Sequence, residues 1–318
     1  MSQMKETFGG FQAGLLGFTL VGFTIFVAGS FKPVPAQQAG QKTFASCEQA
    51  STALFVAVEN GDVPTLLQIL GPAANEIISS GDEDEDRNSR HQFAAKYREM
   101  HRLSTESDGT TILYIGAENW LMPIPLVQKG SGWYFDTIAS KREILFRRIG
   151  ANELATIAVC RELVAAQKEY YVEPHDNDPV MQYAPRLVSD AGKHNGLYWK
   201  ISSSEPESPI GPLLTLASQE EYAKETNQPR PFHGYYYRIL TGQGRHAPGG
   251  VKKYLVKGKM TGGFAFVAYP AEYRDSGVMT FIVNQNGIVY QKDMGPNTVA
   301  RARMLSLYDP DSSWQIVH

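Results

Sequence analysis

Histidine, tyrosine and arginine gather around one predicted strand in the C-terminal third of the chain. His233 precedes the run Gly234–Leu240, and His246 follows it in a glycine-rich loop. Within the run, Tyr235 and Arg238 carry a phenol and a guanidinium, so these side chains could bind an anionic or sugar-like ligand. Loops at one edge of a sheet commonly carry function. The alternative is that His233 and Arg238 brace the loops around the strand.

A second group of chemically competent residues is the sequence His175-Asp176-Asn177-Asp178. Asp176 and Asp178 could bind calcium, which proteins hold by carboxylate and carbonyl oxygens. A capped turn is the alternative, because Asp and Asn favour turns. The acidic run Asp82–Asp86 lacks the glycine of an EF-hand, and we interpret it as a solvated segment before a helix. No other cofactor is expected.

The chain contains two cysteines, Cys47 and Cys160. In an oxidising compartment they could form a disulfide, and the alternative is two buried thiols that pack as small hydrophobes. No Gly-x-Ser-x-Gly motif, recognisable Cys/His pair or phosphate-binding loop is present. The enzyme question stays open, and the absence of a catalytic motif favours a non-catalytic protein.

The N-terminal segment differs in composition from the rest of the chain. Residues 13–31 carry no charge and are rich in Leu, Phe and Val. They could be a signal peptide that is cleaved after Val34-Pro35-Ala36, because small residues stand at the required positions. They could also be a retained anchor, since about 19 apolar residues can cross a bilayer, or a buried helix. Both of the first two interpretations export residues 37–318 to the periplasm, either free or anchored in the inner membrane.

The overall charge gives no argument for a nucleic-acid partner. The 318 residues have a formal net charge of −3, and no basic patch stands out. We therefore expect an envelope protein or a small ligand as partner, and membrane contact only through residues 13–31 if they are not cleaved. The length favours about two domains after the N-terminal segment.

The pattern of helices and strands predicts an α+β protein. Helices are predicted at 47–58, from Asp62 with Pro64 in the first turn, at 73–79, at 88–101 and at 140–171 with a break at Gly150. Strands are predicted at 110–115, 123–128, 132–136, 234–240, 264–269, 278–283 and 288–292, the last two joined by a hairpin turn at 284–287. We place the domains at 1–36 (signal or anchor), 43–150 and 151–318.

Helices followed by a curved antiparallel sheet make residues 43–150 similar to the nuclear-transport-factor-2-like and cystatin-like folds. Such a fold does not by itself imply a function. Residues 151–318 resemble the globular headpiece of type IV pilins and pseudopilins, in which a helix packs on an antiparallel sheet. The resemblance rests on the order of four patterns, namely Ala-Gln-x-x-Tyr in the helix, Gly-Leu-Tyr, Gly-Tyr-x-Tyr-x-Ile and FVAYPAEYRDSGVMTFIVNQNGIVY. The prepilin cleavage signal is absent, which argues against polymerisation through an N-terminal helix.

Longer segments resemble a bacterial exported family known as domain of unknown function 2950. They are LLQILGPAANEIISSGDEDEDR, WLMPIPLVQKGSGWYFDTIASKREILFRRIGANEL, PFHGYYYRILTGQG, APGG and GGFAFVAYPAEYRDSGVMTFIVNQNGIVYQKDMGP. This resemblance implies export but no activity. The sequence therefore predicts an exported envelope or periplasmic protein that acts as a non-catalytic binding or structural module. The alternative is a periplasmic hydrolase with its site around His233, Arg238 and His246.

Overall fold

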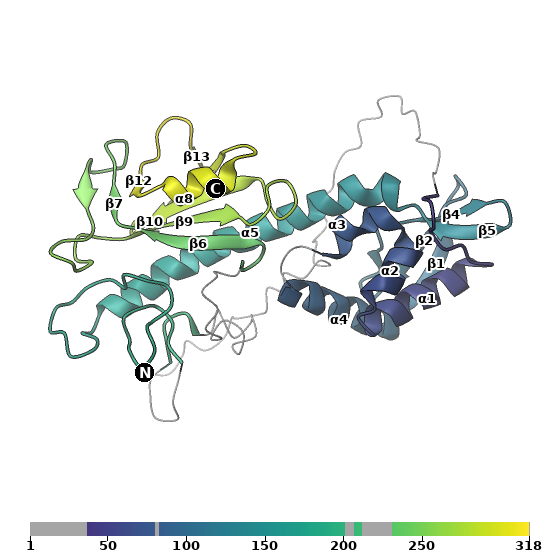
Figure 1. Cartoon of the computed structure of the whole chain (residues 1–318), viewed down its shortest axis with the longest axis horizontal. Helices are drawn as coiled ribbons and strands as arrows, with labels where there is room; N and C mark the ends of the chain where they lie inside the picture. The colour runs from purple at the N-terminus through teal and green to yellow at the C-terminus, as the bar shows by residue number, and fades with distance from the viewer. Residues whose placement is uncertain (1–36, 80–82, 201–206, 212–230, 318) are drawn as a thin grey trace. The chain divides into compact units, whose positions relative to one another are not determined.

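The computed structural model describes residues 37–79, 83–200, 207–211 and 231–317 (Figure 1). The chain divides into two compact units. The first contains the described residues up to Asn75 together with Arg87–Ile144, and the second contains Glu76–Asp86 together with the chain from Leu145 onwards. The predicted signal or anchor lies outside the described residues. Within the described ranges, no helix combines the length and the apolar character needed to cross a membrane.

Among the described residues, five helical segments precede the first sheet. They are α1 (Cys47–Glu59), α2 (Val63–Leu70), the short 3-10 helix η1 (Pro72–Ala74), α3 (Asn75–Ile78) and α4 (Glu83–Glu99). One of them, α2, begins at the capping residue that the sequence predicts, Asp62. The Ser46 side chain accepts a hydrogen bond from the Gln49 amide at the start of α1. The Asp62 side chain accepts a hydrogen bond from the Thr65 amide at 3.0 Å at the start of α2. A proline lies in the first turn of this helix. These caps satisfy amides that have no partner within the helix.

The first unit contains an antiparallel sheet with the order β1-β2-β4-β5, in which β3 also pairs with β2. Its strands are β1 (His101–Thr105), β2 (Thr111–Ile115), β3 (Trp120–Leu121), β4 (Leu126–Lys129) and β5 (Gly132–Phe135). Both bounds of the helix predicted at 88–101 were wrong. Helix α4 begins at Glu83, so residues 83–86 of the acidic run form its first turn and do not precede the helix. It ends at Glu99, because β1 pairs along its whole length with β2. That pairing is a tertiary contact, which local propensity does not reveal.

Helix α5 (Thr137–Tyr171) is continuous, so the predicted break at Gly150 was also wrong. A glycine inside a helix costs about 1 kcal/mol relative to alanine. Around this position, Arg148, Asn152 and Glu153 all make hydrogen bonds to other segments of the second unit. These contacts outweigh the local preference.

The second unit is built on an antiparallel sheet with the order β13-β11-β10-β9-β6. Its strands are β6 (Tyr235–Leu240), β9 (Ala265–Pro270), β10 (Met279–Asn284), β11 (Val289–Asp293) and β13 (Gln315–Ile316). The predicted turn between β10 and β11 is present, and Gly287 has a φ of +77° there. The C-terminal part of α5 covers one face of this sheet, and α8 (Thr298–Met304) lies on the other (Figure 1). The prediction of an α+β fold with two antiparallel sheets and a long helix is confirmed.

A small sheet lies beside the main sheet of the second unit. It consists of β12 (Leu307–Tyr308), β7 (Gly242–Gln243) and β8 (Lys252–Lys253), with β12 parallel to β7 and β8 antiparallel to it. The core of the second unit is strongly aromatic, and Tyr235, Tyr254, Phe264, Phe266 and Phe281 have no exposed surface.

Candidate functional site

His233 lies in the turn that leads into β6 and is partly buried. Its φ is +50° and that of Gly234 is +71°. A Cβ atom at Gly234 would lie 2.6 Å from Asn152 Nδ2 and 2.9 Å from Ser276 Cβ, so this turn needs glycine both for space and for backbone conformation. Burial lowers the pKa of His233 to about 4. At neutral pH the imidazole is therefore uncharged and offers no positive charge to an anionic ligand.

We expect His233 to make the protein less stable in acid. Its pKa is about 4 in the folded protein and 6.5 in its ordinary state, so the unfolded chain binds more protons between these values and stability falls as the pH falls from 6.5 to 4. The full shift corresponds to about 3 kcal/mol, and partial exposure of the ring reduces the expected loss to about 2 kcal/mol. Urea unfolding at pH 7 and pH 4.5 measures this loss in the free energy of unfolding. The variant His233→Gln should lose less stability over this range than the wild type, and equal losses would contradict the assignment.

Tyr235 is a core residue of β6. Its side chain is fully buried, and its hydroxyl donates to the Met279 carbonyl at 3.0 Å. Burial also raises the pKa of Tyr235 well above its usual value. Two residues along the strand and on the same face, the Tyr237 hydroxyl donates to Thr156 Oγ1 of α5 at 3.2 Å. Tyr235 thus joins β6 to β10 within the core and presents no surface to a ligand.

Arg238 lies on the opposite face of β6 and contacts the C-terminal end of α8. Its guanidinium donates to the Ala302 carbonyl at 2.8 Å and to the Leu305 carbonyl. The last carbonyls of a helix have no partner within the helix and carry partial negative charge, which a guanidinium stabilises. Arg238 therefore makes the bracing contact that was the alternative to ligand binding.

His246 lies in an exposed loop after β7 and pairs with Asp309. The distance from His246 Nδ1 to Asp309 Oδ2 is 3.1 Å, and the His246 amide donates to Asp309 Oδ1 at 2.7 Å. His233 precedes β6 and His246 comes after its other end, and a strand of six residues spans about 20 Å. The structure does not bring His233, Arg238 and His246 together around one cavity.

Asp176 and Asp178 lie in a turn that is held by hydrogen bonds. Asp176 accepts from the His194 amide at 2.9 Å. Asp178 accepts from the Lys259 ammonium at 2.6 Å, and this hydrogen bond is the main reason why the pKa of Asp178 is lowered. In the part of the chain that the structure describes, no group of three His, Cys, Asp or Glu residues could hold a metal ion. A lysine thus provides the positive charge beside Asp178.

Both cysteines are buried free thiols in this structure, and a disulfide between them stays a prediction. Cys47 begins α1 in the first unit, and Cys160 lies on α5 in the second. Burial raises the pKa of Cys160 to about 12 and also raises the pKa of Cys47. Thiols with such pKa values form little thiolate at neutral pH, so neither is activated as a nucleophile.

The sequence analysis missed a row of polar residues on α5. Arg148, Asn152 and Thr156 are spaced by four, share one helix face and are buried. Asn152 donates to the Ser276 carbonyl at 2.8 Å. Next to it, a single carboxylate oxygen of Glu153 accepts from two successive backbone amides at the start of β10, each at 2.9 Å. The spacing of four on an otherwise apolar face could have identified this row, but it could not have identified the partners.

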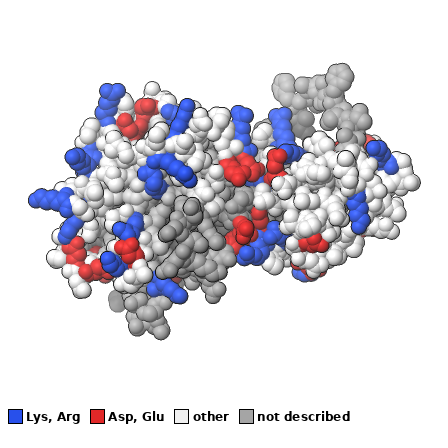
Figure 2. Space-filling view, viewed as in Figure 1, with Lys and Arg blue, Asp and Glu red and all other residues white. Residues whose placement is uncertain are grey.

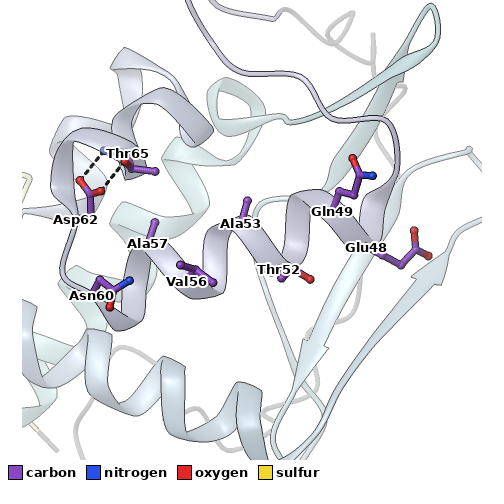
Figure 3. Close-up of a pocket in the computed structure, with 9 residues that line it drawn as sticks. All are labelled: Glu48, Gln49, Thr52, Ala53, Val56, Ala57, Asn60, Asp62 and Thr65. Carbon is purple, nitrogen blue, oxygen red and sulfur yellow. Dashed lines mark hydrogen bonds between the residues drawn. The ribbon is translucent and has the colours of Figure 1, made fainter.

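A shallow groove lies on the first unit. It has a volume of about 540 Å³ and follows one face of α1 to the start of α2 (Figure 3). Three of the residues that line it are apolar, namely Ala53, Val56 and Ala57, and we call these three the floor of the groove. Polar side chains line the rest, namely Glu48, Gln49, Thr52, Asn60, Asp62 and Thr65. Val56 is 46% exposed, which is high for a valine in the middle of a helix.

Carboxylates stand at both ends of the groove. Hydrogen bonds lower the pKa of Glu48, chiefly one from its own amide, and lower that of Asp62, chiefly one from the Thr65 hydroxyl. Both are therefore ionised at neutral pH. They are fourteen positions apart along a largely helical path, which corresponds to about 20 Å. The groove thus combines an apolar floor with a negative charge at each end.

The comparisons with known proteins define the class of this chain. The model of a family described as protein of unknown function (DUF2950) matches residues 41–317, so the chain belongs to this family. No curated protein matches the chain. No solved structure matches it either, and the resemblances to pilin headpieces and to the nuclear-transport-factor-2-like and cystatin-like folds therefore stay predictions.

Proposed function

We propose that the protein is an exported, non-catalytic binding module, and that the α1 groove is its binding surface. The observation that carries this proposal is the apolar floor of the groove between two ionised carboxylates. The small, partly exposed side chain of Ala53 leaves room for the backbone of a partner to come close. The best-fitting partner is a segment of an envelope protein with apolar side chains between two basic residues, since opposite charges fix the orientation of such a segment.

Two further observations support the proposal. The uncharged segment 13–31 favours export to the periplasm, either after cleavage or as an inner-membrane anchor. The residues of the alternative, a periplasmic hydrolase, do not converge: Arg238 binds the end of α8, and His246 binds Asp309. Catalysis by general acid and base requires groups within hydrogen-bond reach of one substrate, and this set does not meet that condition. These contacts favour the binding module over the hydrolase.

Site-specific photo-cross-linking of the full chain in bacterial cells tests this proposal. A photoreactive phenylalanine in place of exposed Thr52 should give one discrete cross-linked protein in the periplasmic or envelope fraction. The additional change Ala53→Arg, which fills the floor, should reduce the product at least tenfold, whereas Ala53→Ser should not. A probe in place of exposed Glu106, in the same unit but outside the groove, is the control. A cytoplasmic location, or a product that is unaffected by Ala53→Arg, would overturn the proposal.

A further inference from the structure

One segment of the second unit carries positive charge without any negative charge. From Pro231 to Ala271 the sequence contains six Lys and Arg residues and no Asp or Glu, although the whole chain carries a net charge of −3. This corrects the expectation that no basic patch stands out. The net charge of the whole chain does not show that positive and negative residues are unevenly distributed along it. Figure 2 shows Lys and Arg side chains at the edge of the second unit where Figure 1 places β7 and β8.

Three of these lysines belong to a short surface segment, Val251–Gly258, which we term the lysine loop. Its one buried side chain is Tyr254, whose hydroxyl donates to Gln243 Oε1 at 2.8 Å. The Tyr254 amide donates to the Thr241 carbonyl, and its carbonyl accepts from the Gly262 amide, both at 2.9 Å. These contacts fix the loop before any partner binds, which reduces the entropy cost of binding.

The remaining side chains of the lysine loop are exposed and are of two kinds. Val251, Leu255 and Val256 are 75%, 42% and 44% exposed. They are interspersed along the chain with the exposed lysines Lys252, Lys253 and Lys257. Exposed aliphatic side chains next to lysines are typical of surfaces that lie in the headgroup region of a bilayer, where apolar groups enter the acyl boundary and ammonium groups meet lipid phosphates.

The tip of the lysine loop places a lysine in an unusual backbone conformation. Val256 and Lys259 exchange two backbone hydrogen bonds, and between them Lys257 and Gly258 have φ values of +50° and +80°. Asn or Gly is usual in the first position of such a turn. A lysine in this position costs conformational free energy. A functional role for its charge at the tip of the loop accounts for that cost.

Among the residues that the structure describes, no salt bridge joins a carboxylate to Lys252, Lys253 or Lys257. Asp178 is paired with Lys259, which lies just beyond the loop, and Asp309 is paired with His246. The three exposed lysines and three exposed aliphatic residues therefore form one surface that is both positive and apolar.

We propose that the lysine loop binds the surface of an anionic lipid bilayer. The lysines fit the negative charge of the headgroups, and the aliphatic side chains between them fit the acyl boundary below, a combination that a soluble polyanion would not use. This contact is separate from residues 13–31 and from the α1 groove, and it does not depend on the proposed partner. Each lysine near an anionic surface strengthens binding roughly fivefold.

A fluorescent label on the lysine loop of the full chain tests the proposal. Val251→Cys allows an environment-sensitive fluorophore to be attached there, because both native thiols are buried. With vesicles of phosphatidylcholine containing about one third phosphatidylglycerol, we expect blue-shifted and stronger emission, and with pure phosphatidylcholine no change. Residues 13–31 can enter both kinds of vesicle, so the difference reports on the loop. Adding Lys252→Gln, Lys253→Gln and Lys257→Gln should weaken loop binding roughly a hundredfold.

The matched control removes three exposed lysines elsewhere, by Lys129→Gln, Lys168→Gln and Lys200→Gln, and so changes the net charge equally. This variant should bind as the labelled parent does. The proposal is overturned if anionic lipid leaves the emission unchanged, or if the two triple variants behave alike. A response to soluble polyphosphate without a response to vesicles would also overturn it and would indicate a soluble polyanion as the partner.

Discussion

Replacing Arg148 by methionine should lower the free energy of unfolding by about 4 kcal/mol. The Arg148 side chain is 2% exposed and pairs with Asp275 at 2.9 Å. It also donates to the carbonyls of Glu76 at 2.7 Å and Ser79 at 3.3 Å, and to that of Ile77. Methionine would fill much of the space but would leave a partly buried carboxylate and three carbonyls without their donor. Chemical denaturation followed by circular dichroism measures the loss.

The pH dependence of this loss separates the ion pair from simple packing effects. Burial raises the pKa of Asp275, and Arg148 opposes that rise. Without Arg148 the pKa should rise further, so the folded state holds a proton that the unfolded state releases, and stability falls as the pH rises. The deficit of Arg148→Met should therefore be smaller at pH 4 than at pH 7, and Asp275→Asn should reduce it at pH 7. A deficit independent of pH would contradict the role of the ion pair.

The variant Gly277→Ala should be destabilised by about 3 kcal/mol, at the upper end of the range for overpacked cores. A Cβ atom at Gly277 would lie 2.0 Å from the hydroxyl oxygen of Tyr235 and 2.5 Å from its Cζ. The ring cannot move aside easily, because it is fully buried and its hydroxyl is bound to the Met279 carbonyl. Thermal and urea unfolding of the purified variant measure the effect.

A double-mutant cycle with Tyr235→Leu shows whether this clash is the cause. The shorter leucine removes the ring atoms that the new methyl group would meet, at its own cost of a cavity and a lost hydrogen bond. Alanine at position 277 should then cost less than 1 kcal/mol in the leucine background. If Gly277→Ala costs the same in both backgrounds, the clash with Tyr235 is not its cause.

Local signals were sufficient to predict much of the fold. Asp62 with Pro64 marks the start of α2 because both residue types act within one helical turn. The strands β2, β6 and β9 were predicted close to their observed bounds, since β-branched and aromatic residues gather there. The continuity of α5 through Gly150 could not be predicted, because it depends on contacts made by residues far apart in the sequence.

The candidate site was harder to predict than the fold. We chose the candidate residues by their type, namely His233, Tyr235, Arg238 and His246. Residue type does not show whether a side chain already makes a hydrogen bond or an ion pair with another part of the protein. Arg238 reaches the last turn of a helix sixty residues later, and no pattern near Arg238 indicates this. The lysine loop was not predicted, because the net charge of the whole chain hides a local excess of lysine, and its exposure depends on Tyr254 being the one side chain of the loop that turns inward.

The course of the chain through its two units has a consequence for synthesis and inheritance. Glu76–Asp86 belongs to the second unit, although residues of the first unit come before and after it. During translation, the carbonyl groups of this segment lack their hydrogen-bond donor until Arg148 has been synthesised. Arg148 in turn lacks its ion-pair partner until Asp275 has been synthesised. A single genetic crossover also cannot transfer the second unit alone to another protein. Its two segments are separated in the sequence by residues of the first unit. The two units should therefore be inherited together.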